Sequence, residues 1–241
     1  MEPFLSLIVP AYNEQARLPA SLPRIHDFLA AQTFSWEMLL VDSGSTDRTA
    51  DLIRDFAARH PGVCLVQVDR PGKGLAVRRG MLAARGEYRF ICDADLSMPI
   101  DQLPRFLPPH LPGVDIAIAS REAPGARRHG EPAYRHFVGR VFNWLVRRLT
   151  IPEIQDTQCG FKCFRRVAAE DLFRVQRLEG WTFDVEVLYV ALRRGYRIVE
   201  VPIPWTYDPG SRVHVGRDSL IMLADLFRIR RAWGRGDYAP R

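Results

Sequence analysis

The chain has 241 residues, of which 47% are hydrophobic and 26% charged, so it is long enough for one large α/β domain or two small ones. Basic residues outnumber acidic ones by 34 to 28, which gives a formal net charge of +6, and all of them except Lys73 and Lys162 are arginines. This excess favours anionic surfaces and phosphates. It does not predict a nucleic-acid-binding protein, because no recognition motif of the usual kinds accompanies it.

The sequence contains no apolar run of the roughly 18 to 20 residues that are needed to span a bilayer. The N-terminus also lacks the succession of basic, apolar and small residues that marks a signal peptide. We therefore expect a cytoplasmic protein, peripheral at the cytoplasmic face of a membrane.

Short apolar runs alternate with helical patterns along the first half of the chain. The predicted strands cover residues 4–10, 38–41, 63–68, 88–92 and 114–120. The predicted helices cover residues 18–31, 47–60, 73–85, 134–149 and 220–233. Strands that alternate with helices through short connections predict an α/β fold with a mostly parallel central sheet and flanking helices.

Unusual polar segments follow the first four predicted strands. They are Tyr12-Asn13-Glu14, Asp42-Ser43-Gly44-Ser45, residues 69–74 and Asp93-Ala94-Asp95. Ligands bind beyond the carboxyl ends of the strands in such a sheet, so these segments predict one functional crevice.

Two aspartates one residue apart, Asp93 and Asp95, follow the fourth predicted strand. Close carboxylates repel each other, and a divalent cation or a cationic ligand compensates that repulsion. The pair therefore indicates a site for a metal and a diphosphate, and the alternative is a solvated turn or a helix cap.

Two common nucleotide motifs do not fit the glycines around Lys73. In a dinucleotide fingerprint the third glycine would fall at Val77, and the glycine pair is not in the first turn between a strand and a helix. A Walker phosphate loop is excluded because no Gly-Lys is followed by Ser or Thr.

The motifs together resemble those of glycosyltransferase family 2, which has the GT-A fold. The resemblance rests on residues 9–14, 41–47, 72–74 and 93–95 in the first half of the chain. Residues 156–162 and 180–186 resemble the dolichyl-phosphate glucosyltransferase branch. The family resemblance implies a GT-A domain over residues 1–215, and we expect an amphipathic C-terminal helix and tail over residues 216–241.

The resemblance also implies a binding site for a nucleotide sugar. The residues implied to bind the donor nucleotide are Pro10, Tyr12, Glu14, Asp42, Lys73 and Asp93. Asp93 and Asp95 are implied to hold Mg²⁺ or Mn²⁺ against the diphosphate. In related dolichyl-phosphate mannosyltransferases a Gln two residues after the second Asp joins the metal, whereas this chain has Ser97.

The mechanism requires cations for two phosphate groups. We assign Arg121 to the donor diphosphate, and Arg135 and Lys162 to the acceptor phosphate. We also expect Ser211 and Arg212 to lie in a loop that closes over the donor.

Further positions in residues 156–162 and 180–186 complete the expected catalytic and acceptor site. Asp156 is either a base or a residue that orients the Gln158 loop, and we favour orientation. Trp181, Asp184 and Glu186 are assigned to the sugar or acceptor pocket, and the alternative is a helix start with Asp and Glu in its first turn.

The resemblance implies metal-dependent, inverting transfer of glucose from UDP-glucose to a polyprenyl phosphate of the dolichyl type. The alternatives are a different nucleotide sugar such as GDP-mannose, a soluble saccharide acceptor, or a silent nucleotide sensor. A lipid acceptor requires a membrane surface, reached with or without a partner subunit. Two basic amphipathic helices fit this role through apolar stripes, unless those stripes pack on the sheet. The stripes are Val138, Phe142, Leu145 and Leu149, and Met222, Leu226, Ile229 and Trp233.

Overall fold

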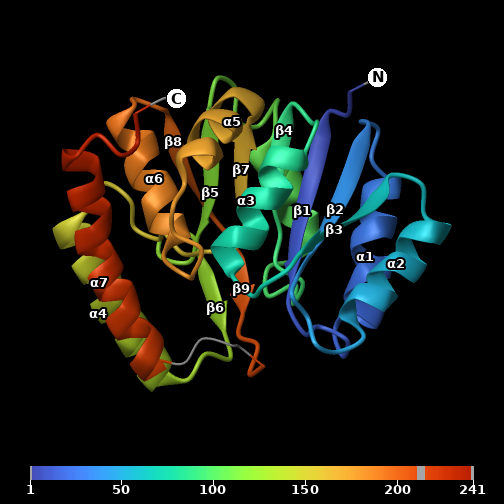
Figure 1. The fold of residues 1–241 in the computed structure, drawn as a ribbon, viewed down its shortest axis with the longest axis horizontal. Helices are drawn as coiled ribbons and strands as arrows, with labels where there is room; N and C mark the ends of the chain where they lie inside the picture. Colours follow the sequence, from blue (N-terminus) through green and yellow to red (C-terminus); the bar gives the residue numbers. More distant parts are fainter. Residues whose placement is uncertain (1, 211–214, 240–241) are drawn as a thin grey trace.

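The computed structural model describes residues 2–210 and 215–239. Within them, a central sheet has the strand order β3-β2-β1-β4-β7-β5-β8, and β6 and β9 form a separate pair (Figure 1). The strands are β1 (Leu5–Ala11), β2 (Trp36–Ser43), β3 (Val63–Val68), β4 (Tyr88–Ile91), β5 (Ile116–Ser120), β6 (Arg127–His129), β7 (Lys162–Arg165), β8 (Ile198–Pro202) and β9 (Pro204–Thr206). All pairings are parallel except those of β7 with β4 and β5.

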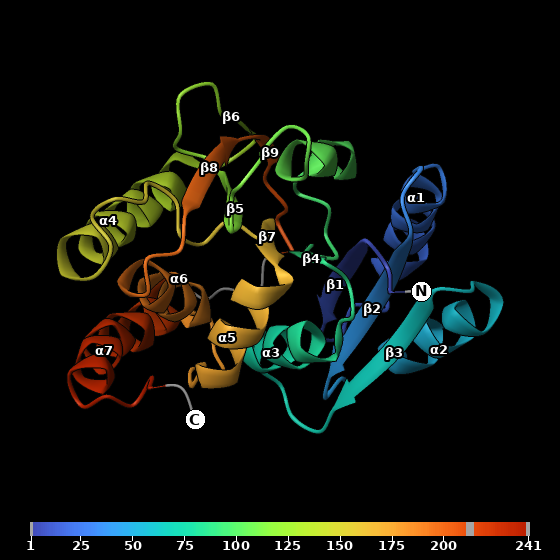
Figure 2. The same ribbon diagram turned by 90° about the horizontal axis from the view of Figure 1, so that it is seen from above.

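Helices cover both faces of the central sheet (Figure 2). They are α1 (Leu18–Ala30), α2 (Thr49–Arg59), α3 (Lys73–Ala83), the 3₁₀ helix η1 (Ile100–Phe106), α4 (Ala133–Leu149), α5 (Arg166–Val175), α6 (Phe183–Arg193) and α7 (Val215–Gly234). The core cluster on one face contains residues of α1, α2 and η1, and the cluster on the other contains residues of α3 to α7. This is the predicted α/β sheet with flanking helices.

Strand β1 shows why the sheet needs cover on both sides. Every residue from Leu5 to Ala11 is buried. Successive side chains of a strand point to opposite faces, so Leu7 and Val9 pack in the cluster with α1, while Ile8 packs in the cluster with α3. A strand buried on both faces reads as a continuous apolar run, which is the pattern that predicted it.

The elements expected in the first half are confirmed, with ends shifted by a few residues at most. The sequence did not predict β7, which is antiparallel and begins at Lys162. It also missed η1, β6, β8, β9 and α5.

The two basic amphipathic helices form, and α4 packs against α7. Met222, Leu226 and Ile229 of α7 are buried in the same cluster as the sheet, as is Phe142 of α4. For these residues the packing alternative holds. No helix in the described part of the chain is both long and apolar enough to cross a bilayer.

Gly80 of α3 lies directly against β1 and β2, with no room for a side chain. A Cβ at this position would collide with the side chain of Ile8 and lie 2.9 Å from Cγ2 of Val41. We expect Gly80→Ala to lower the free energy of unfolding by about 1 to 3 kcal/mol, because the core would be overpacked. Chemical denaturation measures this change.

The matched control is Gly139→Ala in α4, where no atom outside the adjacent backbone of the helix lies within 4 Å of the added Cβ. This change should raise the stability by up to about 1 kcal/mol, because alanine favours a helix. Equal stabilities of the two variants would show that α3 is not packed as described.

Candidate active site

A cavity of about 360 Å³ lies at the carboxyl end of the parallel strands, between the sheet and the helices α4, α6 and α7. The predicted crevice is therefore present. The predicted site residues that line it are Pro10, Glu14, Lys73, Asp93, Asp95, Arg121, Arg135, Asp156, Gln158, Trp181 and Asp184. Tyr12, Asp42, Lys162 and Glu186 do not line it, and Ser211 and Arg212 lie outside the described residues.

Asp93 follows β4 and forms an ion pair with Lys73, the first residue of α3. Burial would lower the pKa of Lys73, but the attraction of Asp93 outweighs it and the pKa is raised. The carboxylate also lies against Gly160, where an added Cβ would collide with it. Gly160 therefore leaves the space that Asp93 occupies, and it is a site residue that the sequence analysis did not single out.

Among the described residues, Asp95 is a cavity carboxylate that forms no ion pair, although the charge of Lys73 acts on it from a longer distance. It accepts a hydrogen bond of 2.9 Å from the backbone N–H of Ser97. Desolvation, followed by repulsion from Asp93, raises the pKa of Asp95. The nearby carboxylate oxygens of Asp93 and Asp95 fit a divalent cation, which would relieve that repulsion. No cluster of three or more His, Cys, Asp or Glu side chains forms a metal site in the described chain, so other oxygen ligands would complete the shell.

Arg121 and Asp156 form a bidentate ion pair in the wall of the same cavity. Nε and Nη2 of Arg121 donate to Asp156 at 2.7 and 2.9 Å, and the backbone N–H of Arg121 donates at 2.9 Å. Burial would raise the pKa of Asp156, but Arg121 lowers it to about 2. Asp156 also accepts the N–H of Gln158 at 3.2 Å, and Glu200 of β8 accepts the N–H of Asp156 at 3.0 Å. These are the contacts of a carboxylate that orients its neighbours.

The guanidinium of Arg121 also lies over the ring of Trp205, 5.5 Å from its centroid. Arg128 lies over the same ring at 5.7 Å, and Arg135 lies over Tyr207 at 5.4 Å. Trp205 and Tyr207 line the cavity. The sequence analysis missed both aromatics, although the segment from Pro202 to Tyr207 combines prolines with aromatics.

Lys162 differs from its prediction as an acceptor ligand. Its side chain is 2% exposed, and Nζ donates to Asp184 at 2.6 Å and to the carbonyl of Cys159 at 2.5 Å. The ammonium is thus enclosed behind the cavity wall rather than presented to it. Asp184 does line the cavity, in the first turn of α6, so the helix-start alternative also applies to it.

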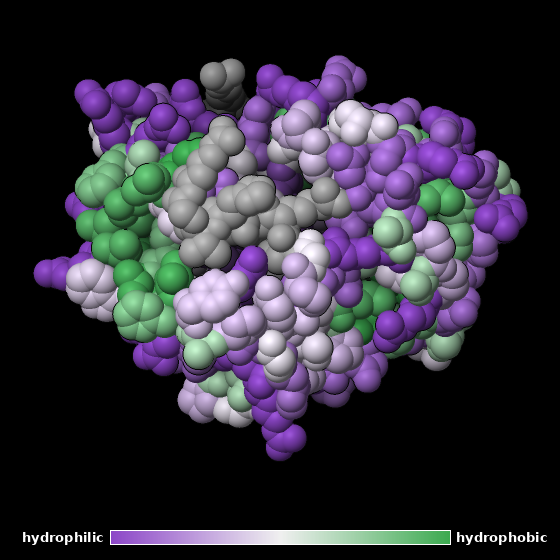
Figure 3. Space-filling view, turned by 90° about the horizontal axis from the view of Figure 1, so that it is seen from below, coloured by the Kyte–Doolittle hydropathy of each residue, from purple (hydrophilic) through white to green (hydrophobic). Residues whose placement is uncertain are grey.

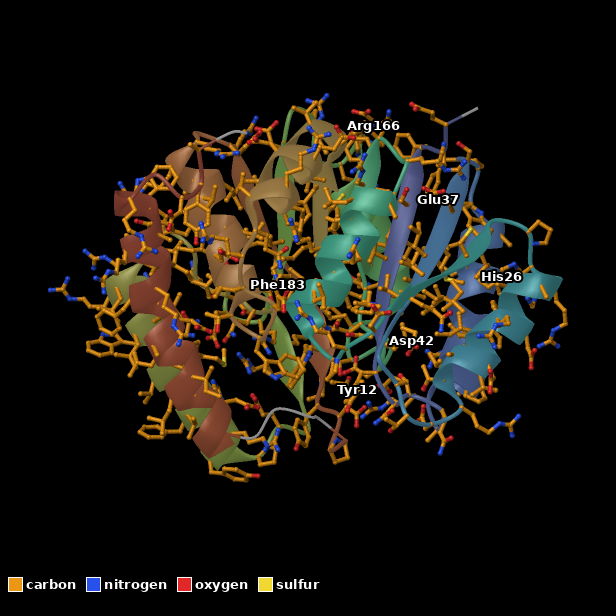
Figure 4. The ribbon with its side chains drawn as sticks, viewed as in Figure 1. Tyr12, His26, Glu37, Asp42, Arg166 and Phe183 are labelled. Atoms are coloured by element: carbon orange, nitrogen blue, oxygen red, sulfur yellow. The ribbon has the colours of Figure 1, made fainter. Side chains whose placement is uncertain are left out.

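Two buried carboxylates at opposite ends of β2 have different surroundings (Figure 4). Glu37 accepts hydrogen bonds from Ser6 Oγ at 2.6 Å and from the backbone N–H of Arg85 at 2.7 Å. Asp42 is 4% exposed, and its Oδ1 has no partner among the described residues. A buried acceptor without a donor is costly, so Asp42 is suited to a ligand that brings an N–H group.

Asp42 pairs in register with Ala11, which places it beside the start of the Tyr12 segment. Figure 4 shows Tyr12 and Asp42 at the same end of the sheet. Arg17 adds a contact across the chain at this end, since it pairs with Glu14 at 3.0 Å and with Asp208 at 2.9 Å. Nothing in the sequence indicated that Arg17 and Asp208 meet.

The family model for Glycosyl transferase family 2 matches residues 6–173. The chain belongs to this family. The enzyme is similar to the dolichyl-phosphate beta-glucosyltransferase of Dictyostelium discoideum, with 36% identity over 94% of this chain and 74% of the relative. The relative of the same name in Saccharomyces cerevisiae is 34% identical over 98% of this chain and 77% of its own length.

Solved structures of glycosyltransferases share the fold of the enzyme. Glucosyl-3-phosphoglycerate synthase from Mycobacterium tuberculosis in complex with uridine diphosphate superposes with a TM-score of 0.69 at 20% identity, over 94% of this chain and 80% of that chain. A mannosyltransferase from Pyrobaculum calidifontis in complex with GDP-Man and Mn²⁺ superposes with a TM-score of 0.60 at 20% identity. The match covers 95% of this chain and 65% of that chain. The GT-A fold predicted from the sequence is therefore confirmed.

We expect Asp156→Asn to destabilise the enzyme by roughly 3 kcal/mol at pH 7, because it leaves the Arg121 guanidinium without its counter-charge. The pKa of Asp156 is about 2 in the fold against a reference of 3.8, so its contribution is complete above pH 3.8 and is lost as the pH falls through about 2. The difference between the wild type and the variant should therefore shrink toward low pH. Urea denaturation at a series of pH values measures it.

Asp51→Asn is the control, because Asp51 pairs with Arg54 at an exposed position of α2. Exposed ion pairs contribute about 1 kcal/mol or less to the free energy of unfolding. An equal loss in both variants, or a difference that does not depend on pH, would contradict the role given to Asp156.

Proposed function

We propose that the enzyme transfers glucose from UDP-glucose to a polyprenyl phosphate of the dolichyl type, with inversion at the anomeric carbon and with a divalent cation. The observation that carries this proposal is the pair of Asp93 and Asp95 in the cavity wall, where Lys73 forms an ion pair with Asp93 and no described residue forms one with Asp95. The names of the curated relatives, 31% to 36% identical to this chain, support glucose and dolichyl phosphate.

The donor nucleoside would lie at the end of β1 and β2. The unpartnered Oδ1 of Asp42 can accept the imide N–H of uracil, and Tyr12 offers a ring on which the base can pack. Guanine also carries N–H donors, so this feature favours a base with such a group rather than uracil alone. UDP-glucose is chosen over GDP-mannose because the relatives are named as glucosyltransferases.

Asp93 and Asp95 would hold Mg²⁺ or Mn²⁺, with diphosphate oxygens and water as the further ligands. When bound, the cation neutralises charge on the departing nucleoside diphosphate. Arg121 is fixed by Asp156 through Nε and Nη2, and its Nη1 has no partner among the described residues. That nitrogen can donate to the diphosphate without reorganisation, because the guanidinium is already held in place.

The acceptor phosphate would approach the cavity from the side of α4. Its second pKa is about 6, so an oxygen is anionic near neutral pH and needs no strong base to attack the anomeric carbon. Arg135 lines the cavity and is the cation we assign to this phosphate. Trp181, Asp184 and Gln158 complete the proposed sugar and acceptor pocket. We place the enzyme at the cytoplasmic face of a membrane, with or without a partner subunit.

The proposal is tested with purified enzyme, a polyprenyl phosphate in detergent, Mg²⁺, and either labelled UDP-glucose or labelled GDP-mannose. We expect an organic-extractable product from UDP-glucose that has the β configuration. A product from GDP-mannose alone would overturn the donor. Release of UDP without a lipid product, or transfer to a soluble saccharide, would overturn the acceptor.

We expect Asp95→Asn to reduce turnover at least 100-fold, since it removes one metal-binding oxygen charge. Binding of UDP in the presence of Mn²⁺, measured by calorimetry, should weaken in parallel while the melting temperature stays near that of the wild type. The matched control is Asp101→Asn at an exposed position of η1, which should leave both measurements unchanged. Full turnover in Asp95→Asn would contradict the metal assignment.

A further inference from the structure

The exposed apolar side chains of the enzyme are concentrated on two helices. Apart from Leu82 and Val167, every large hydrophobic side chain that is exposed in the described residues lies on α4 or α7. They are Tyr134, Phe137, Val141 and Trp144 on α4, and Leu220, Ile221 and Phe227 on α7, with exposed fractions between 43% and 72%. Figure 3 shows apolar side chains gathered on the side of the molecule where α4 and α7 lie.

These residues are not the stripes predicted from the sequence. Tyr134, Phe137, Val141 and Trp144 recur at intervals of three and four, so they share one face of α4. A different face of the helix buries Phe142. The core of the protein is packed against the inward face of α4. It therefore does not explain why the outward face carries apolar side chains.

Helix α4 is also basic throughout. Its 17 residues include no Asp or Glu, and Arg140, Arg147 and Arg148 form no ion pair within the described part of the chain. These three arginines and Trp144 line a surface groove of about 480 Å³. Arginines beside exposed aromatics match the polar and apolar layers of an anionic membrane surface.

The same two helices line the cavity on their other side. Arg135 and Val138 of α4 and Ser219 and Met222 of α7 belong to its wall. A partner that binds the outer face of α4 and α7 would therefore lie beside the cavity that an acceptor phosphate must enter.

We propose that the outer face of α4 and α7, which we call the docking face, binds an anionic lipid bilayer and so presents the cavity to a membrane-embedded acceptor. The biological role of the docking face rests on the proposed lipid acceptor. Binding of the face to a bilayer, however, requires neither donor nor acceptor. A second copy of the chain is a poorer occupant. In a two-fold contact, the unpaired arginines of α4 would meet the arginines of the other copy, and like charges in an interface are unfavourable.

The experiment is co-sedimentation of the enzyme with vesicles of phosphatidylcholine alone or with 30% phosphatidylglycerol, without donor or acceptor. We expect at least tenfold stronger binding to the anionic vesicles, and weaker binding at high salt. The double variant Phe137→Ser/Trp144→Ser should lose at least tenfold in this binding. Its control, Val167→Ser, removes an exposed apolar side chain of α5 and should bind like the wild type.

A second pair of variants tests the charges. Arg140→Gln/Arg148→Gln should lose most of the preference for anionic vesicles, whereas Arg24→Gln, at an exposed position of α1, should keep it. Neither Phe137 nor Trp144 lines the cavity, so Phe137→Ser/Trp144→Ser should keep the wild-type rate with a short, water-soluble polyprenyl phosphate. With a long-chain phosphate in anionic vesicles, its rate should fall at least tenfold.

Three results would overturn the docking face: wild-type enzyme that does not bind anionic vesicles, apolar variants that bind as well as the wild type, and a dimer in solution that these variants convert to monomer. The last result would assign the surface to a second copy. Vesicle binding in an enzyme that fails to glucosylate any lipid phosphate would instead refute the proposed function while leaving the docking face intact.

Discussion

The architecture of the site depends on placing several carboxylates in one partly buried cavity without leaving their charges uncompensated. Each of the close pairs solves this locally: Lys73 with Asp93, Arg121 with Asp156, Arg17 with Glu14 and Asp208, and Lys162 with Asp184. Burial of a charge is tolerated only when a partner offsets its lost hydration. Asp95 forms no ion pair among the described residues, and its pKa is raised, so the electrostatics of the cavity favour a cationic ligand beside it.

The two halves of the chain contribute different parts of this arrangement. The family model ends at residue 173, and the residues before it carry the carboxylates at the strand ends. Trp181, Asp184 and Trp205 come from beyond that limit and close the cavity on the other side. The antiparallel strand β7 links the halves, since its pairing with β4 and β5 brings the segment around Gly160 against Asp93.

Helices α4 and α7 combine two roles that the sequence analysis treated as alternatives. One face of each helix packs into the core or the cavity wall, as Phe142 and Met222 do, and another face leaves aromatics such as Phe137 in solvent. A helix can do both because its side chains point outward around its whole circumference. The domain boundary that we placed at residue 215 remains a prediction, although α7 packs into the same core cluster as the sheet.

The sequence alone determined the strands and helices of the first half, the position of the crevice and the acidic pair, because apolar periodicity and strand-end residues are local properties. It also supplied the motifs that marked the family. Only the tertiary structure decided which residues meet across the chain. The charge of Lys162 predicted a phosphate ligand, but in the fold the buried Lys162 forms an ion pair with Asp184 instead. Likewise, the apolar stripe of a helix can be found from its periodicity, but which side faces solvent depends on what packs against it, and sequence spacing does not encode those distant partners.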